Sequence, residues 1–306
     1  MNALAVSVVI VNWNGGAHLE TCIASVLSHG DGHVDHITVV DNGSTDDSLS
    51  AVRDLPQVHL IEAGENLGFA RACNRGAQGV RSDFLLFLNP DAAVFAGTLG
   101  RALCEMADSA CADVGICGVQ LIDGEGVVAR SCARFPTALG FCLVATGLGR
   151  LFPGRGILME DWAHDQTRDV DHVIGAFFLV RRQLFEDLGG FDERFFVYLE
   201  DLDFSLRAKQ RGWRSRYLVE AKAFHLGGGT SSQVKDRRLF YSLRSRILYA
   251  FKHFKRPEAV SVLVATCVAE PLIRLVWAGA KFSWSTFAET LRGYRMLYRW
   301  ILLRGS

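Results

Sequence analysis

Short apolar runs alternate with amphipathic, helix-like segments along the first hundred residues. The apolar runs have the length of buried strands and cover residues 6–11, 37–40, 58–61 and 84–88. Apolar residues then recur at helical spacing at Leu19, Ile23, Val26 and Leu27, and a later helix is predicted over 69–80. Strands alternating with helices are typical of βαβ units, so this pattern predicts an α/β fold with a largely parallel sheet.

The pattern loosens beyond Gly100 and becomes regular again later in the chain. It predicts strands over 114–119 and 173–180, a hairpin at 123–126, and two short strands at 217–219 and 223–224. A helix is predicted from about Tyr198 to Arg211, and the residues at 45–48 predict a helix cap after the second strand. Residues 135–167 are weakly patterned and yield no assignment.

Three of the first four predicted strands end in loops rich in Asn and Asp. These loops cover residues 12–16, 41–44 and 89–91. Tight turns use the same residue types, so each loop taken alone is equally well explained as turn chemistry. In an open parallel sheet, however, ligands bind outside the carboxyl ends of the strands, and three such loops together favour a binding site there.

The distribution of charge divides the chain in two. The 306 residues are 49% hydrophobic and 22% charged, which excludes disorder, and 33 basic residues balance 33 acidic ones. Residues 235–306 nevertheless carry 14 basic and four acidic residues, a net charge of +10, and the preceding 234 residues carry a net charge of −10. We therefore expect a domain over 1–234 and a basic tail over 235–306 that meets an anionic surface.

The cysteines and the chain start indicate a reducing compartment. The eight cysteines include no C-x-x-C pair, which favours reduced, buried thiols. The first residues lack a basic segment before their apolar run, so no signal peptide is predicted and a cytoplasmic location is expected. The longest apolar stretch, residues 259–269, is too short to cross a bilayer, although it could lie on one.

Asp91 follows the apolar run at 84–88, where a carboxylate is presented as the strand ends. A divalent cation bridging two phosphates prefers oxygen ligands and needs few protein groups. His225 follows a predicted strand and precedes three glycines, so it is the natural second ligand. A lone histidine is more often structural, and that reading stays open for His225.

Three acids, Glu200, Asp201 and Asp203, lie within four residues of a predicted helix. Such a helix start is often simply solvated, because the helix dipole favours acids there. A general base needs a carboxylate held rigidly toward a pocket, and a helix near its N-terminus provides that. The aromatic residues around these acids argue against simple solvation.

Several of these motifs together resemble family 2 glycosyltransferases, particularly the rhamnosyltransferase-like branch. The resemblance spans Val6 to Thr230 and is carried by an ordered set of segments: 6–14, 39–46, 66–70, 89–91, 190–193, 200–201 and the glycine loop after His225. It implies the GT-A fold, a Rossmann-like mixed sheet flanked by helices, here followed by a C-terminal helical extension. It also implies nucleotide-diphosphate sugars as donors and inversion at the anomeric carbon.

The resemblance assigns roles residue by residue. Asp201 matches the catalytic base, Asp91 matches the last acid of the metal-binding D-x-D, and His225 resembles a late histidine that joins the metal. The residues expected at the donor are Asn12, Asn14, Asp41, Asn66, Gly68, Arg71, Asn89 and Gly175. Of these, Asp41 would accept a hydrogen bond from the pyrimidine base. The residues expected at the acceptor or in support are Asp192, Glu200 and Asp203.

One departure from the family pattern concerns the metal. Asn89 stands where many relatives have Asp, so the divalent cation, Mg²⁺ or Mn²⁺, is expected to be bound more weakly, without strict dependence. Two other classes stay open: a nucleotidyltransferase, although residues 12–16 hold no Lys or Arg, and a non-catalytic module that binds nucleotide sugars at a membrane.

The tail over 235–306 combines basic residues with apolar residues at helical spacing and with aromatic rings. A basic amphipathic helix fits an anionic membrane surface, and aromatic rings fit the headgroup level. Packing of the tail on the acidic body or on a second copy is the alternative. If the tail binds a membrane, the acceptor is expected to be a lipid-linked glycan of cell-envelope polysaccharide or O-antigen assembly. The preferred donor is dTDP-rhamnose, from which L-rhamnose would be transferred. No nucleic-acid partner is expected.

Overall fold

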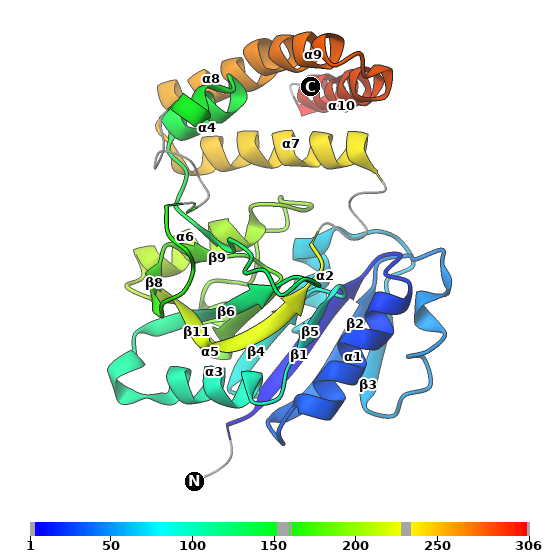
Figure 1. The fold of residues 1–306 in the computed structure, drawn as a ribbon, viewed down its shortest axis with the longest axis vertical. Helices are drawn as coiled ribbons and strands as arrows, with labels where there is room; N and C mark the ends of the chain where they lie inside the picture. Colours follow the sequence, from blue (N-terminus) through cyan, green and yellow to red (C-terminus); the bar gives the residue numbers. More distant parts are fainter. Residues whose placement is uncertain (1–3, 152–158, 160, 228–233, 305–306) are drawn as a thin grey trace. The chain divides into compact units, whose positions relative to one another are not determined.

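The computed structural model describes residues 4–151, 159, 161–227 and 234–304. The chain divides into two compact units (Figure 1). The sheet unit comprises Met1–Phe135, Leu158–Phe196 and Glu200–Thr230, and the helical unit comprises Pro136–Ile157, Val197–Leu199 and Ser231–Ser306. The helical unit thus takes part of the stretch at 135–167 that the sequence pattern left unassigned.

The sheet unit alternates strands and helices in its first half and is more irregular in its second. Its strands are β1 (Val6–Asn12), β2 (Val34–Asp41), β3 (Val58–Glu62), β4 (Phe84–Leu88), β5 (Ala92–Val94), β6 (Val114–Ile122), β7 (Cys132–Ala133), β8 (Arg168–Val170), β9 (His172–Val173), β10 (Phe177–Arg181) and β11 (Arg214–His225). Its helices are α1 (Ala17–His29), α2 (Phe69–Gly76), α3 (Thr98–Ala107), α5 (Arg182–Asp187) and α6 (Glu200–Gln210), with single 3₁₀ turns at Asp47–Leu49 and Ser109–Cys111.

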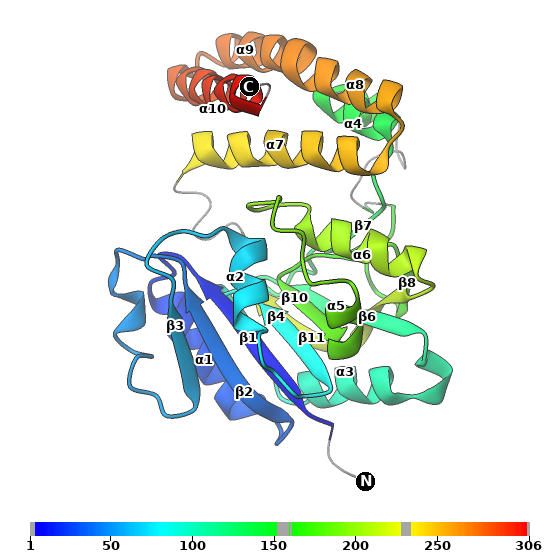
Figure 2. The same ribbon diagram turned by 180° about the vertical axis from the view of Figure 1, so that it is seen from behind.

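The strands form one mixed sheet in the order β3-β2-β1-β4-β10-β6-β11-β5, with β8 paired to β11 and with β7 and β9 forming a separate pair. Strands β3, β2, β1 and β4 are mutually parallel, whereas β10 is antiparallel to both of its neighbours. Strand β1 lies between β2 and β4, so the chain crosses from one side of β1 to the other (Figure 2). The loops after β1, β2 and β4 therefore gather at one edge of the sheet.

Helices cover both faces of the sheet. One core layer joins the sheet to α1 and α3 and includes Leu19, Ile23 and Leu99. The other joins it to α2, α5 and α6 through a cluster of aromatic rings: Phe87, Phe178, Phe185, Phe191 and Phe204. Such buried rings stabilise a core strongly, because each removes a large apolar area from water and pairs edge to face with its neighbours.

Several predicted elements differ from the structure in extent. The predicted strand at 173–180 is split into β9 and β10, and the two strands predicted near 217 and 223 are one irregular strand, β11. The helix predicted over 69–80 ends at Gly76, and the cap predicted at 45–48 begins only a 3₁₀ turn, with Asp46 Oδ1 accepting from the Ser48 N–H. All eight cysteines are free thiols, and five of them are buried, as predicted.

The helical unit contains α4 (Ala138–Ala145), a 3₁₀ turn at Leu148–Leu151, α7 (Lys235–His253), α8 (Arg256–Val264), a π-helical turn (Ala265–Ala269), α9 (Glu270–Ala280) and α10 (Trp284–Arg304). Leu243 and Ile247 of α7 pack against Tyr294 and Leu297 of α10 in its core. The apolar side of α7 is therefore occupied, at these residues, within its own unit.

Helices α8 and α9 continue into each other through the π-turn. Residues Arg256–Ala280 form 25 helical residues with a mean hydropathy of 1.9 over their most apolar window, which is long and apolar enough to cross a membrane. The expectation that this region is too short to do so was wrong, because the helix continues through Glu270 and Pro271. Length and composition alone are weak evidence for a membrane span.

Candidate active site

The side chain of Asn12 holds together the first loops at the carboxyl edge of the sheet. Asn12 is fully buried at the end of β1, and its Nδ2 donates to Asp41 Oδ1 (3.0 Å), Ser44 Oγ (3.0 Å) and Ser48 Oγ (2.8 Å). Its Oδ1 is buried without a hydrogen-bond partner among the described residues. A Cβ on Gly15 would come within 2.5 Å of that oxygen, so glycine is needed there.

The carboxylate of Asp41 is bound by donors from its own loop. Its Oδ2 accepts from the backbone N–H groups of Gly43 (3.1 Å) and Ser44 (3.0 Å), and its Oδ1 accepts from the Ser44 hydroxyl (2.6 Å) as well as from Asn12. Asn14 joins the network because its N–H donates to Ser44 Oγ (2.9 Å). The structure thus brings Asn12, Asn14 and Asp41 together in one hydrogen-bonded loop pair.

Helix α2 begins at a close contact between two segments. Gly68 has φ +83°, and a Cβ there would come within 2.4 Å of the Phe196 carbonyl oxygen, which accepts from the Phe69 N–H at 2.6 Å. Asn66 Oδ1 accepts from the Gly68 N–H (3.0 Å), and Asn42 Nδ2 donates to the Gly68 carbonyl (3.2 Å). Glycine alone fits this position without strain, because both the backbone angle and the space exclude a side chain.

Arg71 projects from α2 with most of its side chain exposed. Its Nε lies 3.8 Å from Glu193 Oε2, an exposed and therefore weak ion pair that leaves the guanidinium able to bind an anion. Asn74, one turn further along α2, accepts from the Phe191 N–H and donates to the Phe191 carbonyl, both at 2.8 Å. Helix α2 is thereby tied to the segment that carries Glu193.

Asp91 and His225 meet where β4 and β11 end. His225 Nε2 lies 3.3 Å from Asp91 Oδ1 and 3.4 Å from Asn89 Nδ2, and both ionisable side chains are 12% exposed. The main chain holds them in register, since His225 pairs with Ala92 of β5 and the Leu226 N–H donates to the Asp91 carbonyl (3.1 Å). Residues 228–230, which complete the predicted glycine loop, lie outside the described residues.

This pair fits a divalent cation that takes most of its ligands from a substrate. It offers one carboxylate oxygen and one imidazole nitrogen side by side, and the imidazole can bind a metal only through an unprotonated nitrogen. Among the described residues, no three His, Cys, Asp or Glu side chains are grouped closely enough to hold a metal ion. A cation at Asp91 and His225 would therefore depend on further oxygens from a bound diphosphate.

Asp201, at the start of α6, has donors on both carboxylate oxygens. Oδ2 accepts from the Gly175 N–H (2.8 Å), Oδ1 accepts from the Leu202 N–H (2.8 Å), and His172 Nε2 lies 3.5 Å from Oδ2. Burial alone would raise the pKa of Asp201, but His172 and the two amides outweigh it and hold that pKa below its usual range. Asp201 is therefore a partly buried carboxylate, 16% exposed, that remains ionised at neutral pH.

His172 is held by a second contact on its far nitrogen. Its Nδ1 lies 3.0 Å from Ser205 Oγ, and the Ser205 hydroxyl in turn donates to the Asp201 carbonyl (3.0 Å). Because both ring nitrogens are engaged, the imidazole cannot turn away from Asp201. His172 and Ser205 were missed by the sequence analysis, since nothing in the local pattern distinguishes a buried histidine in a strand from one that faces an acid.

Glu200 lies beside Asp201, and its pKa is shifted in the opposite direction. Burial, with the adjacent charge of Asp201, raises the pKa of Glu200 well above its usual range. Its side chain is 4% exposed, and its Oε2 has no hydrogen-bond partner among the described residues. The pKa values of the two neighbouring carboxyl groups are thus shifted in opposite directions, an arrangement typical of functional sites.

Asp203 and Asp192 take part in structural ion pairs. Asp203 is fully buried and accepts from Arg207 Nε (2.8 Å), while the other guanidinium nitrogens of Arg207 donate to the Leu188 and Gly190 carbonyls. Asp192 is bound by the Arg194 guanidinium at 2.6 to 3.1 Å. These contacts brace α6 and the segment before it.

A short stretch of backbone connects the Asp201 site to the Asp91 site. The Gly175 N–H binds Asp201, and the next residue, Ala176, accepts a hydrogen bond from the Asn89 N–H at 3.1 Å. A Cβ on Gly175 would lie 3.1 Å from Asp201 Oδ2, so a side chain there would crowd the carboxylate. The structure thus places the predicted base and the predicted metal pair on either side of residues 175–176.

Comparison with known proteins agrees with this geometry. Residues 7–189 match the family described as Glycosyl transferase family 2, and residues 114–304 match Glycosyl transferase family group 2. An N-acetylglucosaminyl-diphospho-decaprenol L-rhamnosyltransferase of Mycobacterium tuberculosis is 33% identical over 233 residues, covering 71% of this chain and 75% of the relative. A low-salt glycan biosynthesis hexosyltransferase, Agl10, of Haloferax volcanii is 26% identical, covering 67% of this chain and 61% of that relative.

Solved structures show the same fold. A mannosyltransferase of Pyrobaculum calidifontis, determined with GDP-mannose and Mn²⁺, aligns with a TM-score of 0.55 over 96% of this chain and 86% of its own, at 19% identity. These likenesses define the class as glycosyltransferases with the GT-A fold. The chain belongs to glycosyl transferase family 2 and resembles its rhamnosyltransferase-like branch, as the sequence motifs predicted.

Proposed function

We propose that the protein transfers L-rhamnose from dTDP-rhamnose, with inversion, to a hydroxyl of a lipid-linked glycan during cell-envelope polysaccharide assembly. The family and its glycosyltransferase relatives support the reaction class. The name of the mycobacterial relative, which specifies L-rhamnose and a decaprenol-linked acceptor, supports the choice of donor and acceptor. In our proposal, the domain over 1–234 catalyses this reaction, and the tail over 235–306 attaches the protein to a membrane surface.

Asp201 is the proposed catalytic base. Its ionised carboxylate takes the proton from the acceptor hydroxyl as the oxygen of that hydroxyl forms a bond to the anomeric carbon. The bond from that carbon to the diphosphate breaks on the opposite face, and the nucleoside diphosphate leaves with the electron pair. A single displacement of this kind inverts the anomeric configuration.

Asp91 and His225 are the proposed ligands of a divalent cation, Mg²⁺ or Mn²⁺. When bound, the cation neutralises the negative charge that develops on the leaving diphosphate. Asn89, beside His225, adds an amide rather than a second carboxylate, so this chain supplies less charge to the cation than a pair of acids would. We therefore propose cation assistance without strict dependence.

The donor nucleotide is proposed to lie along the carboxyl edge of the sheet. The buried Asn12 holds together the loops that form this edge, and the exposed Arg71 can bind a phosphate. The full proposed set is Asn12, Asn14, Asp41, Asn66, Gly68, Arg71, Asn89 and Gly175. Asp192, Glu200 and Asp203 are proposed to support the site or to meet the acceptor.

We propose a cytoplasmic location with reversible attachment to the cytoplasmic membrane. The net charge of +10 on residues 235–306 favours an anionic surface, and the exposed apolar residues of the helical unit favour contact with lipid. A lipid-linked acceptor would be reached at such a surface.

The backbone link between Asp201 and Asn89 through residues 175–176 carries the proposal, because it places a base and a cation pair at the two ends of one short segment. The test is to incubate the purified full chain with nucleotide-diphosphate sugars and Mn²⁺, and to identify the released product. A glycosyltransferase releases a nucleoside diphosphate. In a parallel incubation with a nucleoside triphosphate and a sugar 1-phosphate, release of inorganic pyrophosphate would indicate a nucleotidyltransferase. Donor binding without any release in either incubation would indicate a non-catalytic module.

A further inference from the structure

The helical unit exposes an apolar stripe along α8, the π-turn and α9. Five aliphatic side chains spaced four residues apart are between 42% and 71% exposed: Val260, Val264, Val268, Leu272 and Val276. Near its end, Trp277, Phe282 and Trp284 are 56%, 90% and 80% exposed. Soluble surfaces carry scattered apolar residues, but a continuous stripe with large aromatic residues at one end marks an interaction surface.

The π-turn keeps this stripe on one side of the helix. Four residues of an α-helix turn by about 400°. Side chains spaced four residues apart therefore shift around the helix axis by about 40° at each step. The wider π-turn at Ala265–Ala269, where the Glu270 N–H donates to the Ala265 carbonyl, reverses part of that shift. Pro271 explains the turn, because it lacks an N–H for the Cys267 carbonyl, which accepts instead from the Tyr298 hydroxyl at 2.6 Å.

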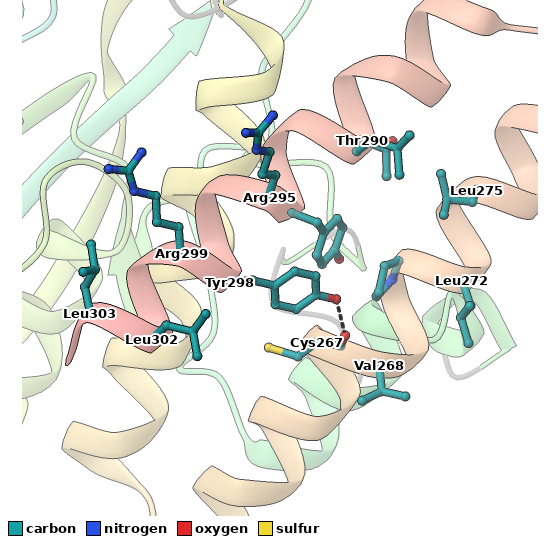
Figure 3. A pocket seen from close by; sticks show the side chains of 13 residues that line it. Cys267, Val268, Leu272, Leu275, Thr290, Arg295, Tyr298, Arg299, Leu302 and Leu303 are labelled. Carbon is teal, nitrogen blue, oxygen red and sulfur yellow. Dashed lines mark hydrogen bonds between the residues drawn. The ribbon is translucent and has the colours of Figure 1, made fainter. Parts of the chain in front are cut away.

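A groove of about 850 Å³ runs beside the stripe, between the π-turn and α9 on one side and α10 on the other (Figure 3). Its lining is largely aliphatic and includes Val268, Leu272, Leu275 and Leu302. Tyr298 reaches across it to Cys267, which covers a backbone carbonyl that would otherwise face the groove. The groove therefore offers hydrocarbon surface with few polar groups.

Two arginines border the groove. Arg295 and Arg299 lie one turn apart on α10 among the residues that line the groove, and Figure 3 shows both side chains leaving the helix on the same side, away from Tyr298 and Cys267. Within the described part of the chain, neither guanidinium pairs with a carboxylate, and the lining of the groove includes no acidic side chain. A hydrocarbon groove bordered by two guanidinium groups matches a ligand with an apolar chain and an anionic head.

We infer that the α9–α10 groove binds the protein to an anionic bilayer. One hydrocarbon chain of a phospholipid enters the groove, and the phosphate of that lipid contacts Arg295 and Arg299. The inference rests on the proposed membrane attachment of the tail over 235–306 and narrows it to α8, α9 and α10, because the apolar side of α7 packs on α10. The exposed tryptophans near the stripe belong at the headgroup level of such a surface.

The same unit argues against two other uses of this face. Glu270, in the middle of the apolar helix, is 3% exposed and binds both Arg246 and Arg274. A helix that crossed the bilayer alone would carry that acid away from Arg246 into hydrocarbon, where an ionised group is costly. A two-fold dimer through this face would bring Arg295 and Arg299 of both copies into one interface, and the lining of the groove offers no acidic side chain to pair with them.

The test compares binding of the full chain to phosphatidylcholine vesicles with and without phosphatidylglycerol, by flotation. We expect binding to the anionic vesicles and a loss of roughly tenfold or more in Arg295→Gln/Arg299→Gln, since each basic residue near an anionic surface contributes about fivefold. The matched control, Arg237→Gln/Arg238→Gln on α7, removes the same charge from exposed positions outside the groove. Equal loss in both variants, or dimerisation without vesicle binding, would overturn the inference.

A second pair of variants tests the apolar part. Leu272→Asp in the groove should abolish binding, whereas Val127→Asp, at a similarly exposed position in the sheet unit, should leave it unchanged. Thermal unfolding of each variant shows whether it is folded, and binding of thymidine diphosphate reports on the sheet unit separately. Nucleotide binding without vesicle binding overturns this inference alone, while vesicle binding without nucleotide binding overturns the proposed reaction alone.

Discussion

His172 Nε2 lies 3.5 Å from Asp201 Oδ2, and the other nitrogen of the same ring lies 3.0 Å from Ser205 Oγ. The acid at the start of α6 therefore has a fixed cationic or hydrogen-bonding neighbour on β9. In this contact one strand and one helix, about 30 residues apart along the chain, fix the charge and the orientation of a single carboxylate. It is also the basis of the predictions for catalysis.

Replacing Asp201 by Asn should remove most turnover while preserving the fold. The amide keeps the size of the side chain but cannot take a proton, and a general base typically contributes about 10²- to 10⁴-fold. Steady-state rates with donor and acceptor measure the loss, and titration with thymidine diphosphate measures donor binding, which should change little. Turnover equal to that of the original chain would refute the assignment of Asp201.

His172→Phe should move the acid limb of the pH profile of kcat/KM to higher pH. Without the imidazole, burial dominates and the pKa of Asp201 rises, so a higher pH is needed to ionise it. Ser205→Ala, which leaves the imidazole in place but frees its far nitrogen, should shift the limb less. A lower rate with an unchanged profile would mean that His172 acts through packing alone.

Glu200→Gln should raise the free energy of unfolding at neutral pH. The folded chain holds the proton of Glu200 to higher pH because its pKa is raised, whereas the unfolded chain ionises it above about pH 4.3. The original chain therefore loses stability relative to the variant as pH rises from that value through the raised folded pKa. Urea unfolding at pH 4 and pH 7 measures the difference, which should be close to zero at pH 4.

Asp91→Ala and His225→Ala should each abolish the cation dependence of donor binding. In the original chain, Mn²⁺ should tighten thymidine diphosphate binding, and removal of the cation with a chelator should weaken it. Calorimetric titration with and without Mn²⁺ gives the comparison. Asp113→Asn, an exposed carboxylate bound to Arg214 outside the proposed site, is the matched control and should retain the full Mn²⁺ effect.

Glu270→Gln should destabilise the helical unit by about 3–5 kcal/mol. Arg246 is 7% exposed and depends on Glu270 for its charge partner, so the variant leaves a buried guanidinium without its counter-charge. Thermal unfolding detects the loss. Arg292→Gln, which removes an exposed partner of Asp236 in the same unit, should cost less than about 1 kcal/mol.

The parallel half of the sheet was predictable because its strands are continuous apolar runs. Strands β1 and β4 are buried along their whole length, and such runs differ clearly from the polar loops after them. The predicted strand at 173–180 is broken because the Gly175 N–H donates to a side chain, that of Asp201, rather than to a neighbouring strand. A contact between residues that far apart leaves no local signal in the sequence.

The site was predictable as a set of residues but not as a set of contacts. Asp91, His225 and Asp201 stood out because each follows or begins a regular element and resembles a family motif. The opposite ionisation of Glu200 and Asp201 depends on burial and on His172, which periodicity does not reveal. Membrane contact was expected of the whole tail over 235–306, because spacing alone does not show that the apolar side of α7 packs on α10.

The saturated carboxylate of Asp41 has a consequence for the choice of nucleotide. An enzyme rejects a wrong base strongly when that base leaves a buried polar group of the site unpaired. Here the Asp41 oxygens already accept hydrogen bonds from Asn12, Gly43 and Ser44. A nucleotide that cannot donate to Asp41 therefore leaves no polar group without a partner. A base that does donate to Asp41 only replaces one of these hydrogen bonds with another of similar strength, so this residue adds little selectivity. The enzyme should therefore accept more than one nucleobase on its sugar donors.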